Sequence, residues 1–377
     1  MKIVGEASAG TTNERDCYIK VKEGDGNIII NSKTKGLFEE HIQEIIRRRM
    51  EEIDVQADVY IEENGAIDYV IISRLESAIS KALGIDIPDK KIRRGKTSKD
   101  RLRRSRLYVP GNNPRFINNV AVYGCDCTIL DLEDSVIMQH KQDARYLVKN
   151  ALKTMDFGKS EIWVRINKEM AKDDIGIISY GSPHGICIPK VESKEDIKLI
   201  EKILEEANLD CHLMAIVETA KGIANAREIA KASDKLVAIA FGAEDYTRDT
   251  GGKREWEFLL YPRFEILISA KSAGIQALDT IYPNVDDEKG LKEETKKIVE
   301  MGFDGKGAIH PSQIEIIHDC FMPSQEEIME AKKIIEAIEE AKKEGRGVAT
   351  IDGRMIDLPV EKKARRIIKL AEAYRKY

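Results

Sequence analysis

The sequence predicts an α/β fold, with a (β/α)8 TIM barrel that a small α+β domain precedes and a C-terminal helical lid follows. Between residues 107 and 309, eight short apolar segments follow one another, and helical segments separate most of them. Parallel strands that alternate with crossover helices in this number close into a barrel, whose active site lies at the carboxyl ends of its strands. A doubly wound open sheet is the structural alternative, but no Gly-x-Gly-x-x-Gly follows the first apolar segment.

Length and pattern divide the chain into four regions. Its 377 residues are enough for two or three domains. We expect a carrier-like α+β domain at 1–88, a basic linker at 89–103, the barrel domain at 104–324, and a C-terminal helical arm and lid at 325–377.

Composition narrows the class of protein. The net charge of −5 argues against a nucleic-acid partner. No apolar run approaches the ~20 residues that span a bilayer, so we expect no membrane partner. The six cysteines are scattered without a Cys-x-x-Cys pair, which favours reduced thiols in the cytoplasm over a zinc site. We therefore expect a cytoplasmic enzyme.

The first domain reads as a small α+β unit. A helix is expected between residues 37 and 50, and a second helix through Leu75, Ile79 and Leu83 ends at Gly84. The dipeptide Asn64-Gly65 predicts a β-hairpin turn, because both residues tolerate positive φ. No cluster of histidines, cysteines or carboxylates resembles an active site, so the domain looks like a carrier or docking unit. Strands are expected at 17–22, 27–30, 59–61 and 69–72.

Ten basic residues lie between Lys90 and Arg106, around Gly95 and Ser98. The stretch holds few large apolar residues and reads as a solvated linker. The alternative is a cationic surface that attracts a phosphate-bearing ligand.

The barrel domain is expected to contain eight strands. Helices are expected at 196–207, 225–232 and 293–301, and a charged helix at 325–343 follows the last strand. The expected strands are 107–109, 127–130, 162–166, 185–188, 212–217, 236–241, 276–281 and 307–309.

Polar residues follow each predicted strand directly. Any one of them could be a helix cap or a surface charge, but their convergence on one rim indicates a ligand site. They include Pro110, Asn112, Asp131, Glu133, Asp134, Arg165, Lys190, Glu192, Glu218, Asp245, Asp279 and His310.

This rim is rich in carboxylates, which suits a hard cation such as Mg²⁺. Glu218 and Asp245 end adjacent predicted strands and are the predicted metal ligands. The alternative is that they cap the helices that begin near residues 220 and 246. Arg165 is a planar donor that suits a substrate carboxylate.

At these motifs the sequence resembles the HpcH/HpaI aldolase and citrate lyase β-subunit family. The resemblance covers residues 104–377, and its combination of motifs is specific. The motifs are 104–115, 130–134, 164–167, 189–193, 218–220, 242–245, 302–306, 309–313 and 352–357.

The family resemblance implies a Mg²⁺-dependent carbon–carbon lyase that acts next to a thioester, such as a CoA thioester. It also implies roles for individual residues. Carried over by motif, the metal ligands are Glu218 and Asp245, the catalytic residues are Asp357, Arg165, Asp131, Glu133 and Asp134, and the substrate-binding residues are Arg165, Pro110, Asn112 and Lys190.

The resemblance places Asp357 on a C-terminal segment that closes over a neighbouring subunit's site. Gly345, Gly347 and Gly353 punctuate this segment, which suits a lid. A lid shared in this way requires a homo-oligomer, and the family suggests a trimer or hexamer.

The first domain is similar to the citrate lyase γ subunit, an acyl carrier protein. The similarity rests on residues 1–3, 7–11, 16, 64–66, 74–76 and 78. Where that family carries a phosphoribosyl-dephospho-CoA group on serine, this chain has Glu14, which cannot form the phosphodiester. The domain therefore carries no prosthetic group, has a structural role, or is modified at another residue.

The favoured hypothesis is cleavage of a citryl thioester, on CoA or a carrier protein, to oxaloacetate and an acetyl thioester within a citrate lyase system. There Asp357 exchanges a proton with the thioester enolate, and a carboxylate after the second strand is one candidate base for the hydroxyl proton. One alternative is a malyl-CoA or citramalyl-CoA lyase. Another is a non-catalytic assembly subunit that docks the citrate lyase α (acyl transferase) subunit.

Overall fold

A computed structural model of the chain describes residues 1–33, 36–343, 349–351 and 354–374. It divides into two compact units: Met1–Pro283 with Phe303–Pro311, and Asn284–Gly302 with Ser312–Tyr377. The glycines Gly345, Gly347 and Gly353 lie outside the described residues. Within these ranges, no helix has the length and hydropathy of a membrane-spanning segment.

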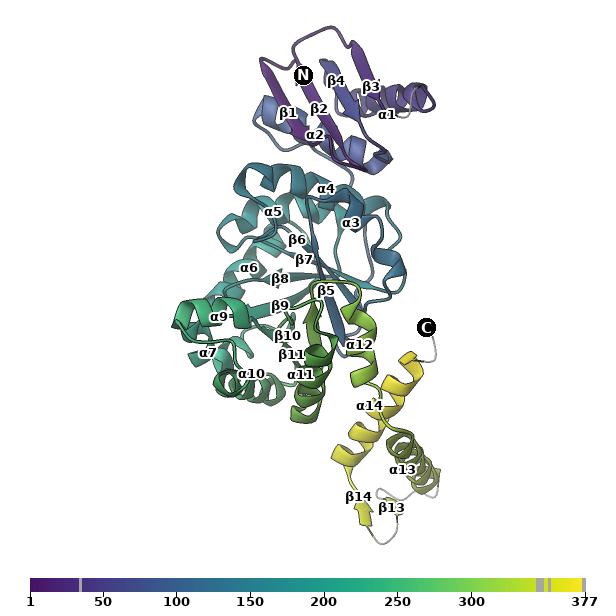
Figure 1. Cartoon of the computed structure of the whole chain (residues 1–377), viewed down its shortest axis with the longest axis vertical. Helices are drawn as coiled ribbons and strands as arrows, with labels where there is room; N and C mark the ends of the chain where they lie inside the picture. The colour runs from purple at the N-terminus through teal and green to yellow at the C-terminus, as the bar shows by residue number, and fades with distance from the viewer. Residues whose placement is uncertain (34–35, 344–348, 352–353, 375–377) are drawn as a thin grey trace. The chain divides into compact units, whose positions relative to one another are not determined.

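Eight parallel strands of the first unit form a closed barrel (Figure 1). Around them lie helices α4 (Lys141–Thr154), α5 (Ala171–Ile178), α6 (Lys194–Glu206) and α10 (Leu260–Ala273). The ring closes where β12 pairs with β5, with Lys306 opposite Ser105. The predicted fold class is confirmed. The strands are β5 (Ser105–Pro110), β6 (Cys127–Asp131), β7 (Glu161–Arg165), β8 (Gly185–Ile188), β9 (His212–Val217), β10 (Leu236–Phe241), β11 (Gln276–Asp279) and β12 (Gly305–Ala308).

The barrel strands are apolar because both of their faces are buried. Every residue of β9 and β10 is buried, as expected for parallel strands with side chains inside and helices outside. Cys127, Ile129, Trp163 and Met214 belong to the cluster that fills the interior. The carboxylate Glu218 follows β9 directly and lies at the strand end, beside the cavity.

The predicted helix at 196–207 is present as α6 (Lys194–Glu206). The expected helix at 225–232 is shorter: α7 and α8 meet at Asn225, whose side-chain amide donates to the Glu192 carbonyl. The N-terminus of α6 is a capping box between Ser193 and Asp196. The helices are α3 (Pro114–Ile117), α4 (Lys141–Thr154), α5 (Ala171–Ile178), α6 (Lys194–Glu206), α7 (Ala220–Ala224), α8 (Ala226–Ile229), α9 (Ala243–Thr250) and α10 (Leu260–Ala273).

The second unit contains four helices and a two-stranded antiparallel sheet among its described residues. The predicted helix at 325–343 is present with those bounds. The elements are α11 (Glu288–Met301), α12 (Gln313–Cys320), α13 (Gln325–Lys343), β13 (Ala349–Ile351), β14 (Arg354–Ile356) and α14 (Leu358–Tyr374).

The N-terminal domain is a four-stranded sheet, in the order β1-β2-β4-β3, with two helices. The strand β1 was not predicted, because its sequence EASAG is short and lacks large apolar residues. The elements are β1 (Glu6–Gly10), β2 (Cys17–Lys22), β3 (Ile28–Ser32), α1 (Glu39–Glu52), β4 (Asp58–Glu63) and α2 (Asp68–Leu83).

The predicted strand at 69–72, and with it the hairpin, is wrong. These residues form the first turns of α2, and Asn64-Gly65 leads from β4 toward a helix. Four consecutive apolar residues suit a buried strand or a buried helix equally, so the run alone cannot decide. The helical spacing continues through buried Ile71, Leu75 and Ile79, and this continuity identifies the helix.

Helix α2 packs against α4 of the barrel through buried ion pairs. Lys149 of α4 lies 2.7 Å from Glu76 of α2 and 3.1 Å from Asp89. Arg49 reaches the same Glu76 at 2.5 Å, and Lys153 reaches Asp89 at 2.6 Å. The side chains of Glu76 and Lys149 are completely buried. Charged groups, rather than apolar contacts alone, therefore join the two domains.

The end of the basic stretch also forms buried ion pairs. Arg103 lies 2.6 Å from Glu161, the first residue of β7, and Arg104 lies 2.8 Å from Asp126. These pairs lie at the amino-terminal ends of the barrel strands, which is the end opposite to the predicted site.

Candidate active site

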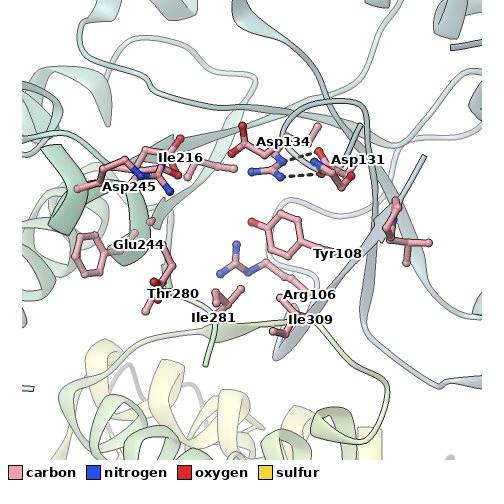
Figure 2. Close-up of a pocket in the computed structure, with 18 residues that line it drawn as sticks. Arg106, Tyr108, Asp131, Asp134, Ile216, Glu244, Asp245, Thr280, Ile281 and Ile309 are labelled. Carbon is pink, nitrogen blue, oxygen red and sulfur yellow. Dashed lines mark hydrogen bonds and ion pairs between the residues drawn. The ribbon is translucent and has the colours of Figure 1, made fainter. Parts of the chain in front are cut away.

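A cavity of about 360 Å³ opens at the carboxyl ends of the barrel strands (Figure 2). Its lining contains side chains from β5, β6, β7, β9 and β10, together with residues that follow the strands. Five carboxylates contribute: Asp131, Asp134, Glu218, Glu244 and Asp245. Of the residues predicted at this rim, six line the cavity: Pro110, Asp131, Asp134, Arg165, Glu218 and Asp245.

Arg165 and Asp131 form a two-pronged ion pair at the wall of the cavity. Arg165 Nε and Nη2 donate to the two Asp131 carboxylate oxygens at 2.7 and 2.8 Å, and Arg165 Nη1 lies 2.8 Å from Glu133. Burial alone would raise the pKa of Asp131, but the charge of Arg165 outweighs it and holds that pKa below its usual value. The guanidinium is therefore fixed in place by two carboxylates.

Glu133 is held between two cations. Lys190 Nζ lies 2.6 Å from its other carboxylate oxygen. Burial raises the pKa of Glu133 above its usual value, and the charge of Arg165 and the Lys190 hydrogen bond offset this only in part. Burial alone would lower the pKa of Lys190. The hydrogen bond to Glu133 outweighs burial and raises this pKa to about 12. A carboxyl with a raised pKa beside a fixed ammonium suits proton transfer.

Glu218 follows β9 and is 3% exposed. Its Oε1 accepts a hydrogen bond from the Lys190 backbone N–H at 2.8 Å. Its pKa rises to about 8, first because of burial and then because of the negative charges of Glu133 and Asp245. A Cβ at Gly242 would lie 2.4 Å from Glu218 Oε2, so glycine at this position makes room for the carboxylate.

Asp245 lies in the first turn of α9 beside the same cavity, where Arg248 is its ion-pair partner. Within the described residues, no group of three or more His, Cys, Asp or Glu side chains is arranged to hold a metal ion. Mg²⁺, however, usually takes one or two carboxylates and keeps several waters. A buried carboxylate that is repelled by a second one fits this pattern, because a divalent cation would neutralise both.

The other predicted site residues lie at different places. Pro110 and Asp134 line the cavity. Asn112 lines a second cavity, together with Glu14 of the N-terminal domain. Asp357 belongs to the second unit and is exposed, and its Oδ1 accepts from the Val360 N–H at the start of α14.

Glu14 is the residue predicted to replace the attachment serine of a carrier protein. It lies in the segment between β1 and β2, and its carboxylate is 3.5 Å from Arg115, the residue after Pro114 at the start of α3. Both side chains are more than half exposed. The position is therefore occupied by a surface ion pair with the barrel.

Among the cavity residues that were not predicted as site residues are Arg106 and Tyr108. Arg106 and Tyr108 lie on β5, and both point into the lower part of the pocket in Figure 2. Arg165 lies over the Tyr108 ring at 5.2 Å. Arg106 could have been identified as a charged residue inside an apolar strand. Its place in the sequence grouped it instead with the basic stretch that begins at Lys90.

Comparisons with known proteins agree with this geometry. Residues 104–311 match the family model described as HpcH/HpaI aldolase/citrate lyase. Residues 4–82 match a model for acyl carrier proteins described as malonate decarboxylase delta subunit (MdcD).

Similar proteins fall in the same family. The citrate lyase subunit beta of Leuconostoc mesenteroides subsp. cremoris is 43% identical over 286 residues, which are 73% of this chain and 95% of that protein. The human mitochondrial citramalyl-CoA lyase is 35% identical, over 71% of this chain and 85% of its own. The crystal structure of protein CitE from Mycobacterium tuberculosis with magnesium, acetoacetate and coenzyme A has a TM-score of 0.58 and 28% identity, covering 73% of this chain and all of that one. The chain belongs to the HpcH/HpaI aldolase/citrate lyase family of lyases, with an acyl-carrier-like domain in front of the barrel.

Proposed function

We propose that the chain is a Mg²⁺-dependent lyase that cleaves the carbon–carbon bond of a hydroxyacyl thioester, with a citryl thioester as its favoured substrate. The observation that carries the proposal is the pair of carboxylates Glu218 and Asp245 in a cavity that also holds Arg165. The similar CitE structure was solved with magnesium and coenzyme A, which supports the same ion and the same class of thioester here.

In this proposal, Glu218 and Asp245 would hold the ion, which would supply Lewis-acid polarisation of the substrate's hydroxyl and carboxylate oxygens. Arg165, fixed by Asp131 and Glu133, orients the hydroxy acid end. Loss of the hydroxyl proton forms a carbonyl, and the electrons of the broken carbon–carbon bond pass to the thioester as an enolate. Glu133, with its raised pKa, is the candidate base on the barrel.

The enolate then takes a proton, and Asp357 is the proposed donor. Because Glu14 cannot carry a prosthetic group through a serine-type phosphodiester, the thioester is a diffusible CoA ester or the arm of a partner. A partner of this kind would be a citrate lyase α or carrier subunit, and a lid from a neighbouring copy would make the active form a homo-oligomer.

An assay of the purified chain with citryl-CoA, malyl-CoA and citramalyl-CoA tests this proposal. We expect Mg²⁺-dependent cleavage that EDTA abolishes and excess Mg²⁺ restores. If the chain prefers malyl-CoA or citramalyl-CoA, the proposed substrate is wrong and the proposed type of reaction stands. The similarity to citramalyl-CoA lyase makes this the second candidate. If no thioester is cleaved, alone or with a citrate lyase α subunit, the chain is a non-catalytic assembly subunit.

Replacing Asp357 with Asn should lower kcat about 100-fold, because a general acid or base contributes roughly that much or more. Asn keeps a side-chain oxygen for the Val360 N–H, so the start of α14 is preserved. Steady-state kinetics measure kcat, and calorimetric titration with Mg²⁺ measures the affinity for the metal. We expect the Mg²⁺ affinity to be unchanged.

Mixing the Asp357→Asn and Glu218→Gln variants tests whether Asp357 serves a neighbouring copy. Hetero-oligomers with one intact site should recover part of the activity after subunit exchange. A wild-type rate for Asp357→Asn alone would remove this residue from the mechanism.

A further inference from the structure

Three arginines line the active-site cavity, and two of them already have carboxylate partners. Arg165 is paired with Asp131 and Glu133, and Arg248 is paired with Asp245. The third, Arg106, is 1% exposed and is the second residue of the first barrel strand, β5. Its charge is permanent, because a guanidinium does not lose its proton in proteins.

Arg106 has weak partners for a buried cation. Its Nη2 donates to the backbone carbonyl of Asp279, and its Nη1 lies 3.8 Å from the Met214 sulfur. Its Nε has no hydrogen-bond partner, and no carboxylate among the described residues forms an ion pair with it. A buried cation without an anion is costly, so a site of this kind gains from binding one.

The nearest acidic residue along this wall is engaged elsewhere. The carboxylate of Asp279 receives Arg263 Nε at 2.8 Å and Lys306 Nζ at 2.9 Å. Only the backbone carbonyl of Asp279 is left for Arg106. The arrangement therefore keeps the Arg106 charge available to the cavity, into which its guanidinium points beside Tyr108 and Ile281 (Figure 2).

The candidate substrates differ in the number of free carboxylates. Malyl and citramalyl thioesters have one, next to the hydroxyl group, and the proposed metal site would take it. A citryl thioester has a second, on a carboxymethyl group, which needs a cation of its own. A planar guanidinium in an apolar surrounding is the side chain best suited to this task.

We propose that Arg106 binds the second carboxylate of the substrate and thereby selects a tricarboxylic acyl thioester over its methyl analogue. The inference rests on the proposed function and assigns the specificity of that site. The other cations of the cavity are committed to carboxylates, whereas Arg106 is buried, charged and turned toward the space that the substrate would occupy.

Citryl-CoA and citramalyl-CoA form the matched pair for the test, because a methyl group replaces the carboxymethyl group. In the full chain, Arg106→Met should lower kcat/KM for citryl-CoA about 100-fold and change that for citramalyl-CoA by less than about threefold. Arg106→Lys, which keeps the charge but loses the planar donor, should fall between the wild type and Arg106→Met. It also guards against a variant that fails to fold.

Binding of the products gives a readout that does not depend on turnover. With Mg²⁺ present, calorimetry should show that Arg106→Met loses affinity for oxaloacetate and keeps its affinity for pyruvate. Equal losses for both ligands, or no loss for either, would overturn the assignment of Arg106. Wild-type cleavage of citramalyl-CoA at least as fast as citryl-CoA would overturn it too, and would leave the lyase function standing. If the wild type cleaves no thioester, the proposed function itself fails.

Discussion

Replacing Glu218 with Gln is expected to lower kcat/KM at least about 1000-fold and to abolish measurable Mg²⁺ binding. The substitution removes the negative charge but keeps the volume and an oxygen that can accept from the Lys190 N–H. A catalytic metal supplies several kcal/mol of transition-state stabilisation, and each ~1.4 kcal/mol corresponds to a factor of ten. Steady-state kinetics and calorimetric Mg²⁺ titration measure the two losses.

The matched control for Glu218 is Glu192→Gln. Glu192 also follows a barrel strand, but its carboxylate pairs with Lys221 at 3.0 Å and does not line the cavity. We expect its activity to stay within about threefold of the wild type. If Glu218→Gln retained both metal binding and turnover, the proposed metal site would be wrong.

The pKa of Glu218 adds a stability test of the same substitution. In the metal-free protein this pKa is raised to about 8. The stabilisation that protonated Glu218 gives to the folded state is complete below its unfolded pKa, and it is lost as the pH rises through about 8. Metal-free Glu218→Gln should therefore lose less stability than the wild type between pH 5 and pH 9. Thermal unfolding across this range, with EDTA present, measures the difference.

Much of the barrel could be predicted because its strands carry a strong local signal. Strands β8, β9 and β10 were predicted with the bounds that the structure shows, since their residues are apolar on both faces. The position of the site followed from topology: residues after parallel strands meet at one rim, and Asp131, Arg165 and Glu218 do so.

What the sequence could not predict depends on contacts between distant segments. The register of the barrel strands pairs Arg165 with both Asp131 and Glu133. The guanidinium that was predicted to bind a substrate carboxylate is therefore already held by two carboxylates of the protein. The apolar run 69–72 suits strand or helix until its continuation packs against α4. The direction in which Arg106 points is decided by the closed ring of strands, which leaves it inside the barrel without a carboxylate partner among the described residues.

Replacing Glu76 with Gln is expected to lower the free energy of unfolding by about 3 kcal/mol. Glu76 lies on α2 of the N-terminal domain and does not line the active-site cavity. The substitution removes the carboxylate that Arg49 and Lys149 share and leaves Asp89 as their remaining buried partner. Breaking a buried ion pair on one side typically costs ~3–5 kcal/mol, because the other charge stays desolvated. Denaturation followed by circular dichroism measures the loss.

Two companion variants separate burial from charge. Glu52 pairs with the same Arg49 at 2.9 Å, but about half of its side chain is exposed, so Glu52→Gln should cost less than about 1 kcal/mol. Adding Lys149→Met to Glu76→Gln removes the stranded ammonium and should recover part of the stability. Hydrogen exchange should then show α2 and α4 losing protection together in Glu76→Gln, because this network joins the carrier-like domain to the barrel. Equal losses in the free energy of unfolding for Glu76→Gln and Glu52→Gln would mean that the network is too exposed to solvent to hold the two domains together.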